Sequence, residues 1–246
     1  MHPLTAVVVA VIAACGPSEP PMQTASVAAQ AAPLLDSTSR IRNDAARHRV
    51  WSLTQAGLAL RDVATAESRV VALPNWHWAH VDYGGCLPDV ALGPRGEVVV
   101  TSNVIPTLWR VDPQTLQVTE HRLSLNADHD KDVGFTGLVY SAQDDAYFAV
   151  SAAHGTLWRI DPLLRKAQKV VLAEPLRGAC AVELRADVRR TARMARLCVR
   201  SAGEAWHVVI APDQRSAYLR GDRCAVGAAA TSVASASPGR GMDIPN

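Results

Sequence analysis

The chain has 246 residues, enough for one large domain or two small ones, and 48% of them are hydrophobic against 20% charged. This much apolar material supports a buried core and excludes a chain that is disordered throughout. Lys and Arg together number 25 and Asp and Glu 23, so the formal net charge is only +2. That balance excludes a nucleic-acid binder that works by neutralising phosphates.

The first fifteen residues have the pattern of an export signal. The run from Leu4 to Ala14 carries no charge and is too short to span a hydrocarbon core of about 30 Å as a helix. It ends at Ile12-Ala13-Ala14-Cys15, which resembles the lipobox of bacterial lipoproteins. The resemblance implies that residues 1–15 are a lipoprotein signal peptide and that Cys15 carries the acyl chains, palmitate among them. It also implies a periplasmic protein held at the outer membrane, because Gly16 rather than Asp follows the cysteine.

Two other interpretations of this segment stay open. Only Met1, His2 and Pro3 precede the apolar run, so the Lys or Arg of a typical export signal is missing. The segment is then either an ordinary signal peptide with a chance cysteine or an apolar N-terminus that is not exported. Residues 16–46, rich in Ala, Gln, Ser and Pro, bury little and are expected to form a flexible tether.

An internal repeat of about fifty residues is the most informative feature of the sequence. Leu108-Trp109-Arg110-Val111-Asp112-Pro113 recurs as Leu157-Trp158-Arg159-Ile160-Asp161-Pro162, 49 positions later. A weaker copy precedes these at Arg61–Leu73, and another is expected to begin at Val208–Leu219. Each copy alternates short Val-, Leu- and Tyr-rich strands with Pro, Gly or Asp turns. Four short antiparallel strands in such a period predict a β-propeller blade.

The repeated segments resemble exported bacterial propellers of the NHL, YVTN and streptogramin-lyase-like type. Their blades end an aromatic strand in an Asp-Pro-x-Thr turn, and Asp112-Pro113-Gln114-Thr115 matches that element. The resemblance covers roughly residues 48–175 and 206–220. It implies an all-β propeller of about four blades over residues 47–226, either a small ring or an incomplete one, followed by a low-complexity tail over 227–246.

The segment before the fourth copy interrupts this period. Apolar residues among arginines predict a short helix near 182–197, with Val182, Leu184, Val188, Met194 and Leu197 on one side. Four cysteines remain if Cys15 is lipidated, and an even number in an oxidising compartment predicts two disulfides. The first expectation is that one bond joins Cys180 to Cys198 across the insertion. The other would then join Cys86 to Cys224 and tie an early blade to a late one.

The densest polar and aromatic stretch lies between two copies, where propellers place their ligand sites. Trp76 and Trp78 are expected to form an aromatic wall, with His77, His80 and Asp82 as polar contacts to a ligand. The alternative is that the two tryptophans wedge between blades and the histidines sit at the rim.

A second candidate occupies the equivalent connection one repeat later. Asp128, Asp130 and Asp132 alternate on a loop, and carboxylates in this pattern suit a hard cation such as Ca²⁺. The loop fails the EF-hand pattern because Val133 stands where Gly is required, and the alternative is a solvated charged loop. Both candidate stretches are expected at the same end of the ring.

No catalytic motif accompanies these features: the sequence lacks a Gly-x-Ser-x-Gly, a P-loop, a dinucleotide fingerprint and a haem-binding Cys pair. We therefore expect a cell-envelope lipoprotein whose propeller is a binding or scaffold module, with no resident cofactor. Its expected partners are the membrane, through the lipid, and an envelope protein or glycan, but no nucleic acid. The alternative is a lactonase- or lyase-like propeller enzyme that depends on a metal or a histidine.

Overall fold

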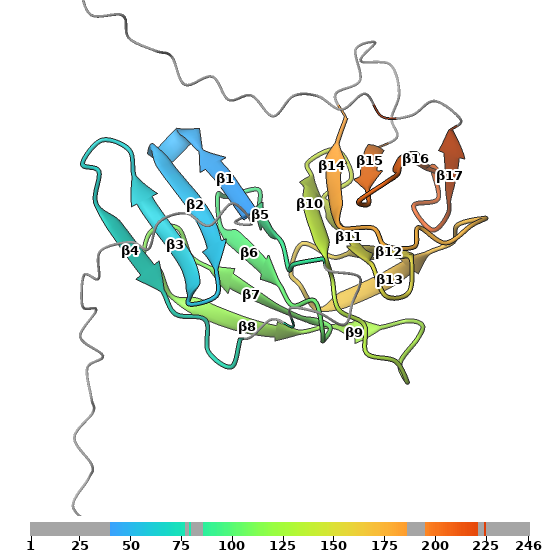
Figure 1. The fold of residues 1–246 in the computed structure, drawn as a ribbon, viewed down its shortest axis with the longest axis horizontal. Coiled ribbons are helices and arrows are strands. Elements are labelled where there is room, and N and C mark those ends of the chain that lie inside the picture. The colour runs from blue at the N-terminus through green and yellow to red at the C-terminus, as the bar shows by residue number, and fades with distance from the viewer. Residues whose placement is uncertain (1–39, 77–78, 80–85, 186–194, 221–223, 225–246) are drawn as a thin grey trace, which may run out of the picture.

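The computed structural model describes residues 40–76, 79, 86–185, 195–220 and 224, which form an all-β protein. Four sheets follow one another in chain order as an arc, each the blade of a β-propeller (Figure 1). Their innermost strands turn toward the middle of the arc, and blades 1 and 4 lie at its two ends. The predicted four-bladed, all-β propeller fold is therefore confirmed.

Each blade is an antiparallel sheet whose four strands run from the inside to the outside in chain order. The bounds are β1 (Arg40–Asp44), β2 (Arg49–Thr54), β3 (Gly57–Asp62) and β4 (Ser68–Val71) in blade 1; β5 (Val90–Leu92), β6 (Val98–Thr101), β7 (Thr107–Val111) and β8 (Val118–Arg122) in blade 2; β10 (Gly137–Ser141), β11 (Ala146–Ser151), β12 (Thr156–Ile160) and β13 (Lys166–Val170) in blade 3; and β14 (Ala181–Leu184), β15 (Arg196–Arg200), β16 (Ala205–Ile210) and β17 (Ala217–Arg220) in blade 4. A short strand, β9 (Ser124–Leu125), adds to blade 3, and one 3-10 turn, η1 (Ala45–Arg47), joins β1 to β2.

The two matching segments of the sequence occupy equivalent places. Trp109 lies on β7 and Trp158 on β12, each in the third strand of its blade, and their exposures are 1% and 0%. Their branched and aromatic neighbours suit a pleated surface that is covered on both sides. The spacing of 49 residues therefore corresponds to the length of chain that forms one blade.

The fourth copy has a different register from the predicted one. Blade 4 opens at Ala181, and Val208–Leu219 belongs to its third and fourth strands, β16 and β17, rather than to its beginning. The extra residues of this repeat lie between β14 and β15, inside the blade, whereas the repeat spacing predicted them before the first strand of the blade.

The predicted helix near 182–197 is wrong at both of its ends. Val182 and Leu184 lie on β14 and Leu197 on β15, and Leu184 pairs directly with Leu197. The apolar residues there follow the two-residue alternation of strands, so their spacing had no helical period. The middle of the predicted helix, 186–194, lies outside the described residues.

The core lies between the blades, as three clusters of apolar side chains, one at each junction. Between blades 2 and 3, for example, Phe135 packs edge-on against Trp158 with ring centroids 6.3 Å apart. Burying a large apolar side chain contributes about 1.5–3 kcal/mol, so each junction stabilises both of its blades. The largest fully buried side chains are Trp51, Trp109, Trp158, Tyr147, Phe135 and Phe148.

A buried carboxylate joins the inner strands of three blades. Asp89 precedes β5 and is 1% exposed. Its Oδ1 accepts hydrogen bonds from Val90 N at 2.8 Å and from Arg42 Nη2 of blade 1 at 2.9 Å, and its Oδ2 accepts one from Leu138 N of blade 3 at 3.0 Å. A buried carboxylate is stable only when it is paired in this way, and the pairing here fixes neighbouring blades to each other.

The outer rim is held by strand pairing between successive blades. β9 continues from the outer strand of blade 2 and pairs in parallel with β13, the outer strand of blade 3. One blade later, Val171 makes the same kind of parallel bridge to Ser216. The outer strands of blades 3 and 4 thus gain backbone hydrogen bonds on edges that would otherwise be open.

The hairpins between the third and fourth strands contain an aspartate turn in all four blades, although Asp213 stands two residues later than the others, where Ala211 takes their place. In each of these turns an aspartate side chain accepts hydrogen bonds from the backbone amides that follow it, an Asx turn. The four residues are Asp62, Asp112, Asp161 and Asp213.

The propeller begins before the predicted boundary at residue 47. β1 starts at Arg40, within the range 16–46 that was expected to be a tether. Residues 1–39, including the predicted signal peptide and Cys15, and the predicted tail 227–246 lie outside the described residues. Within the described part of the chain, we find no helix with the length and apolar character needed to span a bilayer.

Candidate functional site

Trp76 and Ala79, the described residues of the first predicted ligand stretch, lie at the same end of the blades as the second stretch, and we call this the loop end. It carries the β6–β7 loop (102–106), the β11–β12 loop (152–155) and the connections between blades (72–89, 126–136 and 171–180). Trp76 Nε1 donates to Thr101 O at 3.0 Å, which puts the first stretch beside the β6–β7 loop. Phe135 N donates to Ser102 O at 2.6 Å, which brings the second connection to the same loop.

Of the first predicted ligand set, only Trp76 is among the described residues. It is half-buried and packs against the apolar cluster between blades 1 and 2. His77, Trp78, His80 and Asp82 lie outside the described part of the chain, so their role in binding stays a prediction.

Asn103, which the sequence did not single out, holds both ends of this stretch. Its side chain is 2% exposed. Nδ2 donates to Ala79 O at 2.7 Å and to Cys86 O at 3.1 Å, while Oδ1 accepts from Ala79 N at 3.1 Å. A buried amide with all these bonds fixes the ends of the connection that carries the two histidines.

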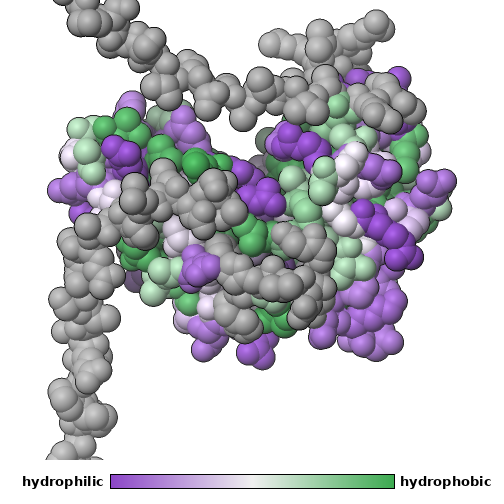
Figure 2. Space-filling view, viewed as in Figure 1, coloured by the Kyte–Doolittle hydropathy of each residue, from purple (hydrophilic) through white to green (hydrophobic). Residues whose placement is uncertain are grey.

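The second predicted stretch forms a hydrophilic lobe after β9. His129, Asp130, Lys131 and Asp132 are exposed there, and Figure 2 shows this lobe in purple at the lower right. Asp128 does not join the other two aspartates: Lys169 Nζ lies 2.6 Å from its Oδ2 and Lys131 Nζ 3.5 Å from its Oδ1.

These lysines pair with Asp128, one of the three aspartates of the predicted Ca²⁺ site. The hydrogen bond from Lys169, opposed by partial burial, holds the pKa of Asp128 below its ordinary value. Among the described residues there is no group of three His, Cys, Asp or Glu side chains placed to hold a metal ion. Asp128 therefore anchors Lys169 to the connection above blade 3.

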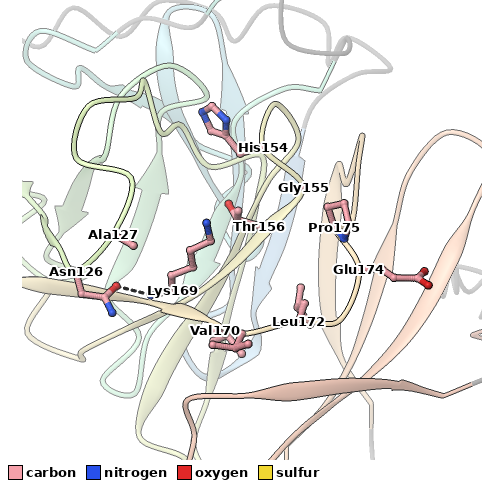
Figure 3. A pocket seen from close by; sticks show the side chains of 11 residues that line it. Asn126, Ala127, His154, Gly155, Thr156, Lys169, Val170, Leu172, Glu174 and Pro175 are labelled. Carbon is pink, nitrogen blue, oxygen red and sulfur yellow. Dashed lines mark hydrogen bonds between the residues drawn. The ribbon is translucent and has the colours of Figure 1, made fainter.

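Beside this ion pair the loop end contains a cavity of about 420 Å³, which we call the rim pocket. Figure 3 shows Asn126 and Lys169 on one side, with His154 and Thr156 above them and Leu172, Glu174 and Pro175 opposite. The pocket is lined by Asn126, Ala127, His154, Gly155, Thr156, Lys169, Val170, Val171, Leu172, Glu174 and Pro175.

Three contacts fix the polar wall of the rim pocket. Asn126 Oδ1 accepts from Lys169 N at 2.7 Å, which ties the end of β9 to β13. His154 Nε2 lies 2.8 Å from Asp132 O, and because a carbonyl only accepts, this nitrogen carries the proton. Thr156 Oγ1 accepts from the buried Trp158 Nε1 at 2.8 Å. The ammonium, imidazole and hydroxyl groups are therefore positioned before any ligand arrives.

The chemistry of the rim pocket suits binding of a small amphipathic molecule. Its volume lies within the usual range for ligand pockets, and its polar wall faces an apolar side made by Val170, Leu172 and Pro175. The sequence patterns above did not single out these residues. The repeat could have indicated them, because its 49-residue period places Lys169 where the previous copy has Glu120, and His154 where it has Ile105.

The two disulfides pair differently from the expectation. Cys86 bonds to Cys180, and Cys198 bonds to Cys224. The predicted Cys180–Cys198 bond is wrong because Cys198 pairs with Glu183 in the sheet, three residues along β14 from Cys180. Three residues of strand separate two positions by about 10 Å, too far for a disulfide. All four cysteines that were expected in disulfides do form them.

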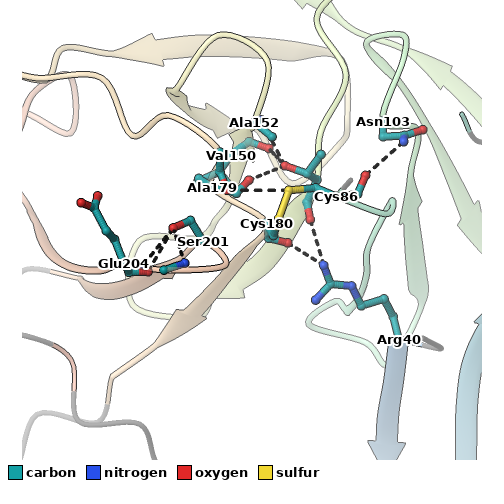
Figure 4. The surroundings of a disulfide bond; sticks show 12 residues. Arg40, Cys86, Asn103, Val150, Ala152, Ala179, Cys180, Ser201 and Glu204 are labelled. Atoms are coloured by element: carbon teal, nitrogen blue, oxygen red, sulfur yellow. Dashed lines mark hydrogen bonds between the residues drawn. A yellow bond between two sulfur atoms is a disulfide. The ribbon is translucent and has the colours of Figure 1, made fainter. Parts of the chain in front are cut away.

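The Cys86–Cys180 bond ties the loop end together across blades 2 to 4 (Figure 4). Cys86 ends the connection that Asn103 holds, and Cys180 precedes β14. Arg40 Nη2 donates to Cys180 O at 2.6 Å, so blade 1 also contacts this point. Beside it, Thr136 Oγ1 donates to Ala179 O at 2.6 Å. The loop end is thus a cross-linked surface on which the rim pocket lies.

No protein-family model matches the chain, and no curated protein matches it. Solved structures do. The chain is 16% identical to a virginiamycin B lyase from Staphylococcus aureus, solved with quinupristin, with a TM-score of 0.55 over 76% of this chain and 57% of that one. A streptogramin B lyase has the same identity and TM-score over 79% and 58% of the two chains.

A third similar structure is an auxiliary nutrient-binding protein from Bacteroides thetaiotaomicron. The identity is 10% and the TM-score 0.51, over 73% of this chain and 40% of the other. The chain thus spans less than two thirds of the length of each of these proteins. At such identities the likeness concerns the fold alone. It shows that the chain has the β-propeller fold of streptogramin B lyase-like and other bacterial propeller proteins.

Proposed function

We propose that the chain is a cell-envelope lipoprotein whose propeller is a binding module, and that it takes an envelope glycan at the loop end. The lipobox-like Ile12-Ala13-Ala14-Cys15 supports the location. The observation that carries the binding role is the rim pocket, a preformed cavity of about 420 Å³. An envelope protein as partner is the other outcome of the test below.

The groups in the rim pocket favour a glycan over a protein partner. Sugar hydroxyls both donate and accept hydrogen bonds, and the pocket offers the Lys169 ammonium, the His154 imidazole and the Asn126 amide within one small cavity. The apolar side contributes contacts for the C–H faces of a sugar ring. A protein interface normally buries about 800 Å² on each partner, a larger and flatter surface than this pocket.

The alternative is an enzyme, and the likeness to two lyases is the observation that favours it. In that case His154, whose Nδ1 is the ring nitrogen without the proton, would be the histidine of the pocket able to accept one. The likeness at 16% identity carries the fold and no residue role, so binding is the proposal that rests on this chain's own residues.

Calorimetric titration of the full chain with chitotetraose, maltotetraose and N-acetylmuramyl dipeptide tests the binding role. We expect saturable binding of at least one probe, and Lys169→Gln should weaken it about tenfold because a charge-assisted hydrogen bond is lost. Lys166→Gln is the matched control, since Lys166 is exposed on the same strand outside the pocket and its loss should leave affinity unchanged.

The outcomes separate the proposals. Binding that is equal in Lys169→Gln and the unchanged chain contradicts the rim pocket as the site. Absence of binding to all three glycans, with saturable binding of a purified envelope protein, contradicts the glycan. Turnover of quinupristin that is lost in His154→Ala would replace the binding module by the enzyme.

The envelope location has its own test. In cells fed labelled palmitate, we expect the label on the full chain and its recovery with outer membranes. Cys15→Ser should abolish labelling and release the protein from the membrane fraction, because no other residue of the lipobox-like motif carries a thiol. Membrane-bound, labelled Cys15→Ser protein would contradict the anchor.

A further inference from the structure

A second cavity lies at the opposite end of the blades, which we call the turn end. It has a volume of about 350 Å³ and sits where the β1–β2 connection of blade 1 meets the hairpins of blade 2. We call it the turn pocket. It is lined by Arg47, Arg95, Glu97, Arg110, Asp112, Pro113, Gln114, Gln117 and Thr119. Three guanidinium groups thus converge on one cavity.

The guanidinium of Arg47 is held in place from behind. Asp44, which is 4% exposed, lies 3.3 Å from its Nη1, and Nη2 donates to Arg95 O at 2.7 Å. It rests against Gly96, where φ is +80° and a Cβ would collide with Nη1. Only glycine fits that backbone without strain, so the close approach of Arg47 is built into the turn.

Arg95 is positioned by a second buried carboxylate. Glu97 is 3% exposed, and its Oε2 accepts from Arg95 N at 2.8 Å. Its Oε1 lies 3.8 Å from Arg95 Nη2. The exposed guanidinium of Arg95 therefore lies near the pocket, which the buried Glu97 also lines.

Arg110 supplies the third cation and makes no side-chain hydrogen bond or ion pair with the described residues. It is half-buried on β7, and no acceptor among the described residues lies within hydrogen-bond distance of its guanidinium. Asp112 also lines the pocket, and its Oδ1 is engaged in the turn, where it accepts from Gln114 N and Thr115 N, both at 2.8 Å. The pocket thus presents a planar fork of donors beside the hydroxyl of Thr119 and the amide of Gln117.

We propose that the turn pocket binds a phosphate or sulfate group, with Arg110 as the principal ligand and Arg47 and Arg95 beside it. A tetrahedral oxyanion matches the bidentate geometry of arginine, and the guanidinium of Arg47 is held in place before binding. The site is separate from the rim pocket, so it stands whether or not the chain binds a glycan. The group that carries the oxyanion is either a soluble molecule or a lipid headgroup.

NMR titration of the full chain with sodium sulfate, against sodium chloride at equal ionic strength, tests the site. We expect saturable shifts at the amides of Gln114, Gln117 and Thr119. Arg110→Gln should weaken sulfate binding about tenfold or more. Arg122→Gln is the matched control, because that exposed arginine on β8 pairs with Glu120 outside the pocket, and it should change the affinity less than about twofold.

A nearby histidine gives a readout that depends on the charge of Arg110. His121 lies two residues beyond Thr119 on β8, and Thr119 pairs with Arg110. Burial and then the charge of Arg110 lower the pKa of His121, while Asp161 across the junction opposes them. Bound sulfate should raise that pKa, and Arg110→Gln should raise it without sulfate and remove the response.

Two further probes separate the sources of the oxyanion. Glucose 6-phosphate represents a soluble ligand, and dihexanoyl phosphatidylglycerol, used below its micelle concentration, represents a headgroup. The source is identified by the probe that binds more tightly than sulfate and whose affinity falls in Arg110→Gln. The proposal is overturned if sulfate shifts are no larger than chloride shifts, or if sulfate binds Arg110→Gln as tightly as the unchanged chain.

Discussion

The loop end and the turn end of the blades are built on different plans. At the turn end the same device recurs in every blade, an aspartate that caps the hairpin between the third and fourth strands. At the loop end, the described parts of the connections are held mainly by side-chain contacts that differ from one connection to the next. One is clamped by Asn103, another by the Asp128–Lys169 pair, and a third by the Cys86–Cys180 bond.

This difference separates fold from function within one repeat. A residue that returns at each period must serve what the blades share, which is the turn and the packing. A residue that appears in one blade only is free to serve a ligand, as Lys169 and His154 do in the rim pocket. The turn pocket combines both kinds of residue, because Arg47 and Arg95 lie in connections outside the repeated Asx turns, whereas Arg110 recurs one blade later as Arg159.

The largest effect expected from this comparison concerns the disulfides. Cys86 and Cys180 are 94 residues apart, and Cys198 and Cys224 are 26 apart. Closing the longer loop restricts the unfolded chain more, so Cys86→Ala with Cys180→Ala should lower the free energy of unfolding by roughly 4–5 kcal/mol. The other pair, also changed to Ala, should cost roughly 3–4 kcal/mol. Denaturant unfolding at equal protein concentration measures both.

The order of the two variants is the sharper part of this prediction. The first bond joins connections of blades 2 and 4, whereas the second holds the segment after β17 to blade 4 alone. A larger loss for the Cys198–Cys224 variant would mean that the loop end is not the main tie between blades. The unchanged protein under a reducing agent loses both bonds, so it should resemble a chain in which all four of these cysteines are changed to Ala.

The local part of the fold could be predicted from the sequence because it depends on near neighbours. Strands, turns and the length of a blade follow from alternation, Asp-Pro steps and the matching Trp109 and Trp158, and the structure confirms them. The prediction of a helix near 182–197 was wrong because it read apolar residues of two paired strands, Leu184 and Leu197, as parts of one continuous element.

The candidate sites depend on contacts that no local pattern records. Asp128 and Lys169 are 41 residues apart and meet because β9 pairs in parallel with β13. The cysteine pairing depends in the same way on which connections meet at the middle of the arc. For Trp76 and residues 128–132, which the structure describes, the sequence did predict one shared end, because position within a repeat fixes the end of the blade.

The smallest effect is expected at the turn end, where each aspartate serves its own hairpin. Asp213→Ala and Asp62→Ala should each lower the melting temperature by a small and similar amount, well below the effect of the disulfides. The amides of Arg215 and then Ser216 hold the pKa of Asp213 below its ordinary value, and the amide of Thr65 does most for Asp62. Melting temperatures measured from pH 7 to pH 2.5 test both changes.

The pH dependence distinguishes the charge from the turn. Because the folded pKa is lowered, the stabilisation by the carboxylate is complete above the unfolded pKa near 3.8 and is lost as the pH falls through the folded value. The gap between the unchanged chain and Asp213→Ala should therefore narrow in acid. Asp213→Asn keeps an oxygen that accepts the same amide hydrogen bonds, so it should retain most of the stability at pH 7 and lose the acid dependence. If Asp213→Asn is as unstable as Asp213→Ala, the negative charge alone stabilises the turn. If Asp62→Ala and Asp213→Ala lower the melting temperature by unequal amounts, the two aspartates do not contribute equally to their hairpins.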